Sequence, residues 1–68
     1  MINEKQTMEN VIKVLNDSKM SVEEIAENLD ISISTYYNWI NYESVPTIGD
    51  LVKISEIFNK PVDDILVF

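Results

Sequence analysis

Two helix-start signals, at Ser21 and Ser32, restrict the folds that are open to this chain. Ser21 is followed three residues later by Glu24, which is the spacing of a capping box. In that motif the hydroxyl and the carboxylate each accept a hydrogen bond from a backbone amide at the start of a helix. Ser32 is a residue of the type that caps a second helix. The sequence therefore predicts two helices of about two turns each, separated by a tight break at residues 29–31.

Each of these short helices has one apolar face. The apolar positions at helical spacing are Ile25, Ala26 and Leu29 in the first helix and Tyr36, Trp39 and Ile40 in the second. Two short helices joined by so short a link cannot lie antiparallel and must cross at a steep angle. That is the helix-turn-helix arrangement, in which the second helix is presented to the major groove of DNA. We place it at residues 21–41.

One further helix is predicted before this unit. Residues 1–6 are expected to form a short arm or the frayed start of a helix, and a clear helix is expected from about Thr7 to Ser18. Its apolar stripe consists of Met8, Ile12 and Leu15, supported by Val11 and Val14.

Two more helices are predicted after the unit. Thr47 and Asp50 have the spacing of a second capping box and predict a helix over residues 48–59. Pro61 suits the first turn of a final helix over residues 61–66, in which Asp63 and Asp64 are helix-start charges rather than a metal pair. The expected inward-facing residues are Ile48, Leu51, Ile54, Ser55 and Phe58 in the first helix and Val62, Ile65 and Leu66 in the second. The predicted fold is all-α, with five helices in one domain spanning residues 1–68.

The residue inventory excludes several classes of function. The chain has neither cysteine nor histidine and also lacks arginine and a glycine-rich loop, so it lacks the usual parts of an enzyme active site. We expect no metal, no cofactor and no small-molecule substrate. No apolar run approaches the roughly 20 residues of a membrane span, and the first residues lack the apolar segment of a signal peptide. We therefore expect a cytoplasmic protein without a membrane partner.

The charge distribution is unusual for a chain with this pattern of helices. Five lysines against twelve acidic residues give a net charge of −7. Residues 20–52 contain no basic residue, and all six of their charged side chains are acidic: Glu23, Glu24, Glu27, Asp30, Glu43 and Asp50. Since neutralisation of phosphates supplies most non-specific affinity for DNA, the expected basic footprint is missing from the unit that would face DNA.

The sequence resembles the lambda-repressor-like (Cro/Xre-type) DNA-binding domains of phage and bacterial regulators. The resemblance covers about residues 8–66 and rests on an SxxEIAxxLxIS stretch, a following W–x6–P spacing and an LxxIxxxF helix. The residues that carry it are Met20, Ser21, Glu24, Ile25, Ala26, Leu29, Ile31, Ser32, Ser34, Thr35, Trp39, Asn41, Pro46, Leu51, Ile54, Phe58 and residues 61–66. It implies a compact five-helix domain that acts as a homodimer on a pseudo-palindromic operator.

The resemblance also implies roles for residues of the helix that begins at Ser32. The residues placed to read bases are Ile33, Ser34, Tyr37 and Asn38, among which the Asn38 amide can bond adenine with two hydrogen bonds and Ile33 can touch a thymine methyl. The residues placed to bind phosphates are Ser32, Thr35, Asn41, Tyr42 and Lys19, with Lys13 and Lys53 as further flanking cations. The bulky apolar residues Val67 and Phe68 are expected either to fold back onto the core or to pack against a second subunit. For the second case we expect the dimer interface at Ile65, Val67 and Phe68.

The sequence departs from the family pattern at the DNA-facing positions. Val22 stands where members usually carry glutamine, and Asp30 stands where a glycine is common. Residues 40–42 replace the usual Glu-Asn-Gly, and Glu43 and Ser44 replace basic residues. These changes keep a second interpretation open: an acidic helix-turn-helix module that binds protein, as an antirepressor, a partner of a DNA-bound regulator or a DNA mimic. In that interpretation the partner contacts Ile33, Tyr37 and Tyr42.

Overall fold

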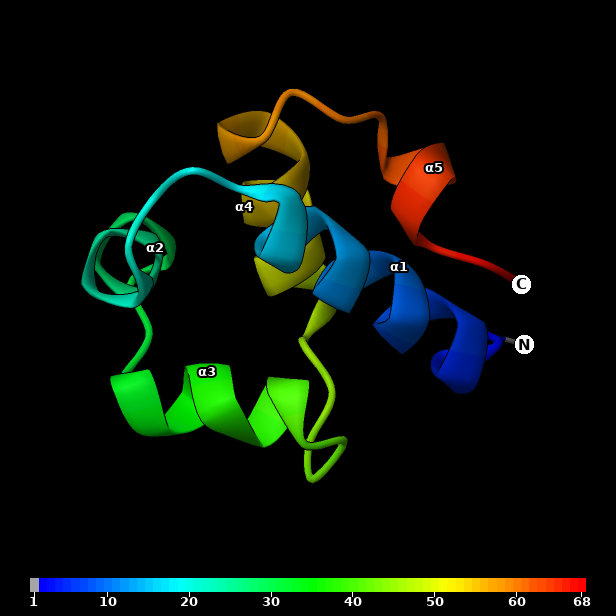
Figure 1. Ribbon diagram of the computed structural model, residues 1–68. Helices are drawn as coiled ribbons and strands as arrows, with labels where there is room; N and C mark the ends of the chain where they lie inside the picture. Colours follow the sequence, from blue (N-terminus) through cyan, green and yellow to red (C-terminus); the bar gives the residue numbers. More distant parts are fainter. Residues whose placement is uncertain (1) are drawn as a thin grey trace.

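The computed structural model describes residues 2–68, and Figure 1 shows how their helices are arranged. The helices are α1 (Glu4–Asp17), α2 (Val22–Leu29), α3 (Ile33–Ile40), α4 (Ile48–Ile57) and α5 (Val62–Ile65). The prediction of an all-α fold with five helices is confirmed. Helices α2 and α3 form the predicted helix-turn-helix, with α3 along one edge of the molecule in Figure 1. No helix within residues 2–68 is long and apolar enough to cross a membrane.

Helix α1 begins earlier than Thr7. Residues 4–6 were expected in an arm or in the frayed start of a helix, and they are helical because the Asn3 side chain accepts a hydrogen bond from the Gln6 backbone amide at 3.1 Å and caps α1. The helix also ends at Asp17, with Ser18 as its extended C-cap. Met1, the first residue of the expected arm, lies outside the described residues.

The predicted helix starts of the central unit are confirmed. Ser21 Oγ accepts from the Glu24 amide at 3.1 Å, and Glu24 Oε1 accepts from the Ser21 amide at 3.4 Å, which completes the capping box. Ser32 Oγ accepts from the Thr35 amide at 3.0 Å and caps α3. Between the two helices Asp30 has a φ of 56°, the left-handed conformation that a short polar side chain tolerates. The tight break therefore uses aspartate in place of glycine.

The two C-terminal helices are shorter than predicted. The Thr47–Asp50 capping box starts α4 as expected, with both hydrogen bonds at 3.1 Å. Helix α4 ends at Ile57 rather than near residue 59, because Asn59 takes a φ of 54° and turns the chain. Pro61 occupies the N-cap of α5 and not its first turn, and Leu66 is the C-cap, so this helix is only four residues long.

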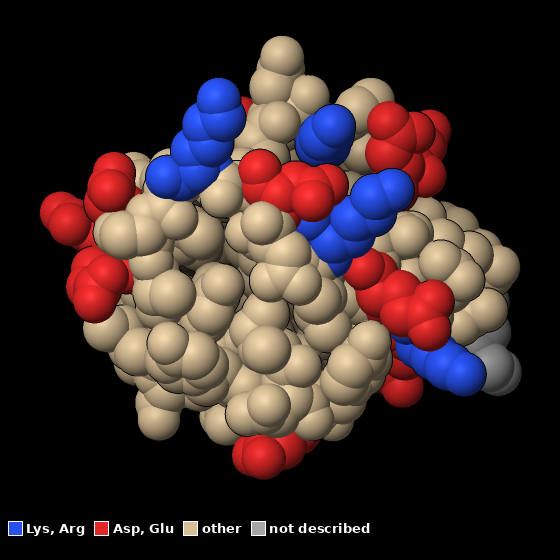
Figure 2. Space-filling view, in the orientation of Figure 1, with Lys and Arg blue, Asp and Glu red and all other residues tan. Residues whose placement is uncertain are grey.

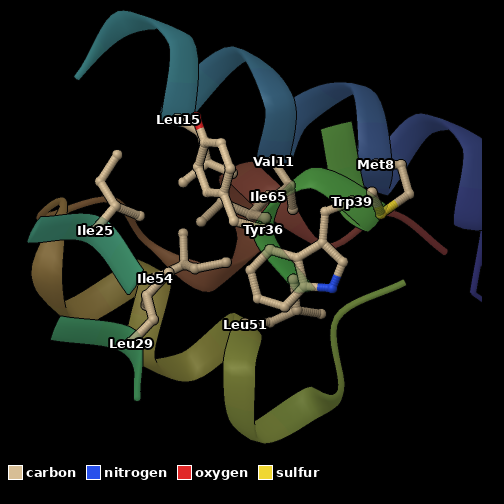
Figure 3. Close-up of a cluster of buried hydrophobic side chains, with 10 residues drawn as sticks. All are labelled: Met8, Val11, Leu15, Ile25, Leu29, Tyr36, Trp39, Leu51, Ile54 and Ile65. Atoms are coloured by element: carbon tan, nitrogen blue, oxygen red, sulfur yellow. The ribbon is translucent and has the colours of Figure 1, made fainter. Parts of the chain in front are cut away.

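One apolar cluster holds the five helices together (Figure 3). Trp39 is 1% exposed and lies among side chains that come from each of the helices. The members of the cluster are Met8, Val11, Leu15, Ile25, Leu29, Tyr36, Trp39, Leu51, Ile54 and Ile65. The predicted stripe of α4 was wrong at its first position. Ile48 directly follows the N-cap and is 56% exposed, because its side chain points away from the cluster.

Ile65 is a second correction. It was predicted at a dimer interface, but it is 1% exposed and belongs to the core, so its side chain cannot contact another molecule. Val67 is half-buried and Phe68 is 79% exposed. Hydrogen bonds tie this C-terminal segment to α1: the Asn3 amide donates to Val67 O at 2.6 Å, and the Val67 amide donates to Thr7 Oγ1 at 2.9 Å. The two ends of the chain consequently lie close together (Figure 1).

Candidate nucleic-acid interface

Helix α3 has one side in the core and one side in solvent. Tyr36 and Trp39 anchor it, with exposures of 6% and 1%. Ile33 and Tyr37 lie four residues apart, so they share a strip of the helix surface, and they are 43% and 48% exposed. Ser34 is also exposed. The buried side therefore fixes the helix, while the outer side presents side chains to a partner.

The N-terminal end of α3 is a hydroxyl network. Ser32 Oγ accepts from the Thr35 amide and also lies 3.0 Å from Thr35 Oγ1, so the two hydroxyls bond each other. Ser32 is exposed and Thr35 is half-buried. A phosphate at this end would meet these hydroxyls together with the unpaired amides of the first helical turn.

The C-terminal end of α3 holds the remaining polar candidates. Asn41 is exposed, and its backbone amide donates a hydrogen bond to Tyr37 O at 2.9 Å. Tyr42 is 58% exposed and has a φ of 61°, which turns the chain away from the helix axis. Asn38 is half-buried, and its backbone carbonyl accepts a hydrogen bond from the Glu43 backbone amide at 2.8 Å. This backbone bond closes the turn and brings the acidic Glu43 next to the helix end.

The two adjacent tyrosines of α3 contact each other. The rings of Tyr36 and Tyr37 have centroids 5.3 Å apart and are nearly perpendicular. Burial, and to a smaller extent the neighbouring Tyr37, raises the pKa of the Tyr36 hydroxyl above its usual value of 10.0. Tyr36 is therefore uncharged under ordinary conditions. The buried Tyr36 ring contacts the exposed Tyr37 ring in an edge-to-face arrangement.

Charges lie around α3 rather than on it. In Figure 2 the lysines lie in the upper and right parts of the surface with acidic side chains among them. Further acidic side chains gather at the left over α2, and another acidic group lies at the lower edge. The surface over α3 between these groups is uncharged. Glu23, Glu24 and Glu27 of α2 are all exposed. A DNA backbone at α3 would meet acidic flanks instead of the usual cations.

The lysines are engaged or placed elsewhere. Lys53 Nζ lies 3.4 Å from Leu29 O, where its charge satisfies a carbonyl at the C-terminal end of α2. Lys13 and Lys60 line a depression of about 390 Å³ that Asp17 and Asp64 also line, between α1 and the α4–α5 region. The sequence did not reveal the Lys53 contact, because it joins residues from separate helices.

Lys19 also lies away from the other phosphate candidates. It belongs to the connection between α1 and α2, which runs along the edge of the molecule opposite α3 in Figure 1. The structure thus brings together the candidates on and after α3 but does not bring Lys19 to them. Within residues 2–68 no group of three or more acidic side chains is arranged to hold a metal ion.

Comparison with known families agrees with this geometry. A helix-turn-helix family model matches residues 7–65, which include all of α2 to α5 and most of α1. The chain belongs to this family, the Cro/Xre-type helix-turn-helix domains. The resemblance predicted from the SxxEIAxxLxIS stretch is therefore confirmed. No curated protein and no solved structure gives a significant match. The helix-turn-helix family consists of DNA-binding regulatory domains.

Proposed function

We propose that this helix-turn-helix protein is a sequence-specific transcriptional regulator that binds operator DNA as a homodimer through α3. The observation that carries the proposal is the two-sided character of α3. Tyr36 and Trp39 fix the helix in the core, and the exposed surface of the helix presents Ile33, Ser34 and Tyr37. A rigid helix with a small polar and apolar outer surface fits the major groove.

The proposed contacts follow from the chemistry of the side chains. Asn38 reads adenine through its amide, while Ile33 contacts a thymine methyl. Ser34 and Tyr37 complete the base-reading set. The proposed phosphate ligands are Ser32, Thr35, Asn41 and Tyr42, which supply neutral hydrogen-bond donors at both ends of α3. Lys19 is left out of this set because of its position.

Such an interface has an unusual dependence on salt. The affinity of most DNA-binding proteins falls steeply with salt, because each phosphate that a cationic side chain neutralises releases bound counterions. The logarithm of the binding constant then falls with the logarithm of the salt concentration, with a slope of about 0.9 per neutralised phosphate. Neutral ligands release few counterions. We therefore expect a shallow slope and a correspondingly larger share of affinity from base contacts.

Selection from a random-duplex library at low salt tests this function, with Asn38→Ala selected in parallel. The expected result is a palindromic consensus in which the variant loses preference at one position of each half-site. A folded protein that enriches no duplex would contradict the proposal.

A second candidate function is supported by the charges. The acidic side chains of α2 and Glu43 flank an uncharged surface on which Ile33, Tyr37 and Tyr42 are exposed. Exposed aromatic side chains surrounded by polar groups are typical of protein interfaces. In this proposal the protein binds the DNA-contacting surface of another regulator and competes with its DNA. Addition of duplex DNA to such a complex would release this protein, whereas a DNA-binding regulator would itself bind the duplex.

A further inference from the structure

The depression between α1 and the α4–α5 region lies apart from α3. Its lining residues belong to α1, to α5 and to the segments that directly follow α1 and α4. In Figure 1 the α4–α5 connection lies at the top of the view and α3 at the bottom. The volume of about 390 Å³ falls in the lower part of the range of small-molecule sites, about 300–1,000 Å³. The depression therefore has the size of a site for a small ligand, away from the exposed surface of α3.

Each wall of the depression carries one lysine and one aspartate. Helix α1 contributes Lys13 and Asp17, which are four residues apart and so lie on the same side of the helix. The other wall contributes Lys60 from the α4–α5 connection and Asp64 from α5. All four residues are exposed, and Figure 2 shows lysines and acidic side chains intermixed in the upper part of the surface. A ligand at this place would meet both signs of charge in equal number.

Three apolar side chains also line the depression, and they are less exposed than its charged residues. Ile65 is 1% exposed and belongs to the core, while Val14 and Phe58 are half-buried. Phe58 is the C-cap of α4, and its backbone amide donates to Ile54 O at 3.0 Å. An apolar group that covers these side chains removes apolar surface from water, which favours binding.

Hydrogen bonds hold the two walls together. The Asn10 side-chain amide donates to Ile65 O at 3.1 Å, and Asn10 Oδ1 accepts from Gln6 Nε2 at 3.2 Å. Ser18 Oγ accepts from the Met20 backbone amide at 3.0 Å, a role that leaves its hydroxyl hydrogen able to donate to a ligand. The bond from Asn10 joins α1 directly to α5. The separation of the walls is therefore set by the fold, which lowers the cost of ordering them around a ligand.

We propose that the depression binds an α-amino acid with an apolar side chain as an effector. The carboxylate of this zwitterion pairs with a lysine of the walls, its ammonium group pairs with an aspartate, and its side chain packs against Phe58 and Val14. A ligand with only negative charge would be repelled by the two aspartates, and a ligand with only positive charge by the two lysines. The amino acid is bound and not converted, so no catalytic group is needed.

The inference does not rest on the proposed DNA-binding function. Because α3 contributes no lining residue, the amino acid and DNA can bind at the same time. Ion pairs in contact with water contribute little free energy, and the charged residues of the walls are exposed. We therefore expect a dissociation constant on the order of 1 mM.

Titration of the isotope-labelled protein with L-leucine, followed by two-dimensional NMR, tests the inference. We expect saturable shifts of the resonances of residues that line the depression, and none for Ser34 of α3. Isocaproate and isoamylamine are the matched ligands, because each keeps the apolar body of leucine and only one of its two charges. Each should bind at least about tenfold more weakly than leucine. Equal binding of either one would overturn the inference. The absence of saturable shifts at about fifty times the expected dissociation constant would also overturn it.

Two pairs of variants locate the charges that leucine uses. Asp64→Asn is compared with Asp63→Asn, since both aspartates are exposed in the first turn of α5 and Asp64 lines the depression whereas Asp63 does not. Lys13→Gln is compared with Lys5→Gln, since both lysines are exposed on α1 and Lys13 lines the depression whereas Lys5 does not. Thermal unfolding verifies that all four variants fold.

The first variant of each pair should raise the dissociation constant of leucine about five- to tenfold, and the second should leave it unchanged. Equal effects within both pairs would overturn the site. The charges of the walls could instead pair only with one another. The variants of lining residues would then lower the melting temperature while leucine shifted no resonance of the wild-type protein, and this result too would overturn the inference.

The outcome is separable from that of the proposed function. A protein that binds leucine in the depression and selects no duplex would support the effector site and contradict DNA binding. A protein that selects a duplex and does not respond to leucine would contradict the effector site and support DNA reading by α3.

Discussion

The exposed surface of α3 and the apolar groove that Ile48 lines begin alike and differ in their surroundings. Ile33 follows the Ser32 cap and Ile48 follows the Thr47 cap, and both side chains are about half exposed, at 43% and 56%. Around Ile33 lie hydroxyls, an amide and acidic flanks. Around Ile48 lies an apolar groove with one charged residue. The same local signal therefore serves two surfaces, and neighbours from distant parts of the chain decide which kind of partner each surface suits.

The largest expected effect comes from removing the support that the two surfaces share. Trp39→Ala should lower the free energy of unfolding by about 3–5 kcal/mol, because it leaves a cavity at the centre of the core. For so small a domain this approaches the whole stability, so both surfaces should be lost together. Urea unfolding followed by circular dichroism measures the change. Tyr42→Ala, at a position 58% exposed, is the control and should change little. A stable Trp39→Ala protein would contradict the shared core.

The next effect should separate the two surfaces. Asn38→Ala should cost about 1–3 kcal/mol of discrimination at one base pair of each half-site, because the amide is the proposed reader of adenine. The dissociation constant of the dimer should not change, because Asn38 is proposed to contact DNA and not the second copy. Titration of the selected duplex and of single-base variants measures the loss. Asn16→Ala, an exposed asparagine of α1, is the matched control. A uniform loss across all duplexes would show that Asn38 does not read a base.

The helix caps should have equal effects in the two regions. Ser21→Ala removes the capping box of α2, and Thr47→Ala removes the corresponding box of α4. Each should lower the free energy of unfolding by about 1 kcal/mol, and the two losses should add, because the boxes share no partner. Denaturant unfolding of the single and double variants checks this. Ser34→Ala, at an exposed position inside α3, controls for the loss of a hydroxyl. Strong non-additivity would mean that the regions are coupled beyond the core.

The smallest expected effect is a decline of stability at high pH that originates under α3. The raised pKa of Tyr36 means that the folded protein keeps the neutral phenol at pH values where the unfolded chain has begun to ionise. The contribution of the neutral Tyr36 phenol to the free energy of unfolding is fully present below about pH 10, and it is lost as the pH rises through the folded-state pKa of Tyr36. Thermal unfolding from pH 8 to 11 measures it. The decline should be smaller in Tyr36→Phe, and an identical profile would exclude this contribution.

Much of the fold can be predicted from the sequence, and the candidate site only in part. The five helices and the helix-turn-helix follow from caps and apolar spacing, and the family follows from the resemblance of the SxxEIAxxLxIS stretch to Cro/Xre-type domains. The structure and the family match agree with both. Asn3 was missed as the cap of α1 because no apolar stripe begins directly after it. The base-reading and phosphate roles remain predictions. Their weak point was charge: nothing in the local pattern reveals that Lys53 is engaged by Leu29 O or that the Lys19 connection lies opposite α3.

The sequence alone predicts the structural features that form between residues a few positions apart. The capping boxes at Ser21 and Thr47 and the left-handed turn at Asp30 depend on short-range hydrogen bonds and on the conformational freedom of one residue. The spacing predicted that Ile65 and Ile48 both face inward; Ile65 is buried as predicted, whereas the packing of the helices leaves Ile48 exposed. Only the tertiary structure decided that the Val67 amide meets Thr7 Oγ1, a hydrogen bond across 60 positions of the chain. Contacts of this kind depend on how helices pack against one another, and helical periodicity alone does not specify that packing.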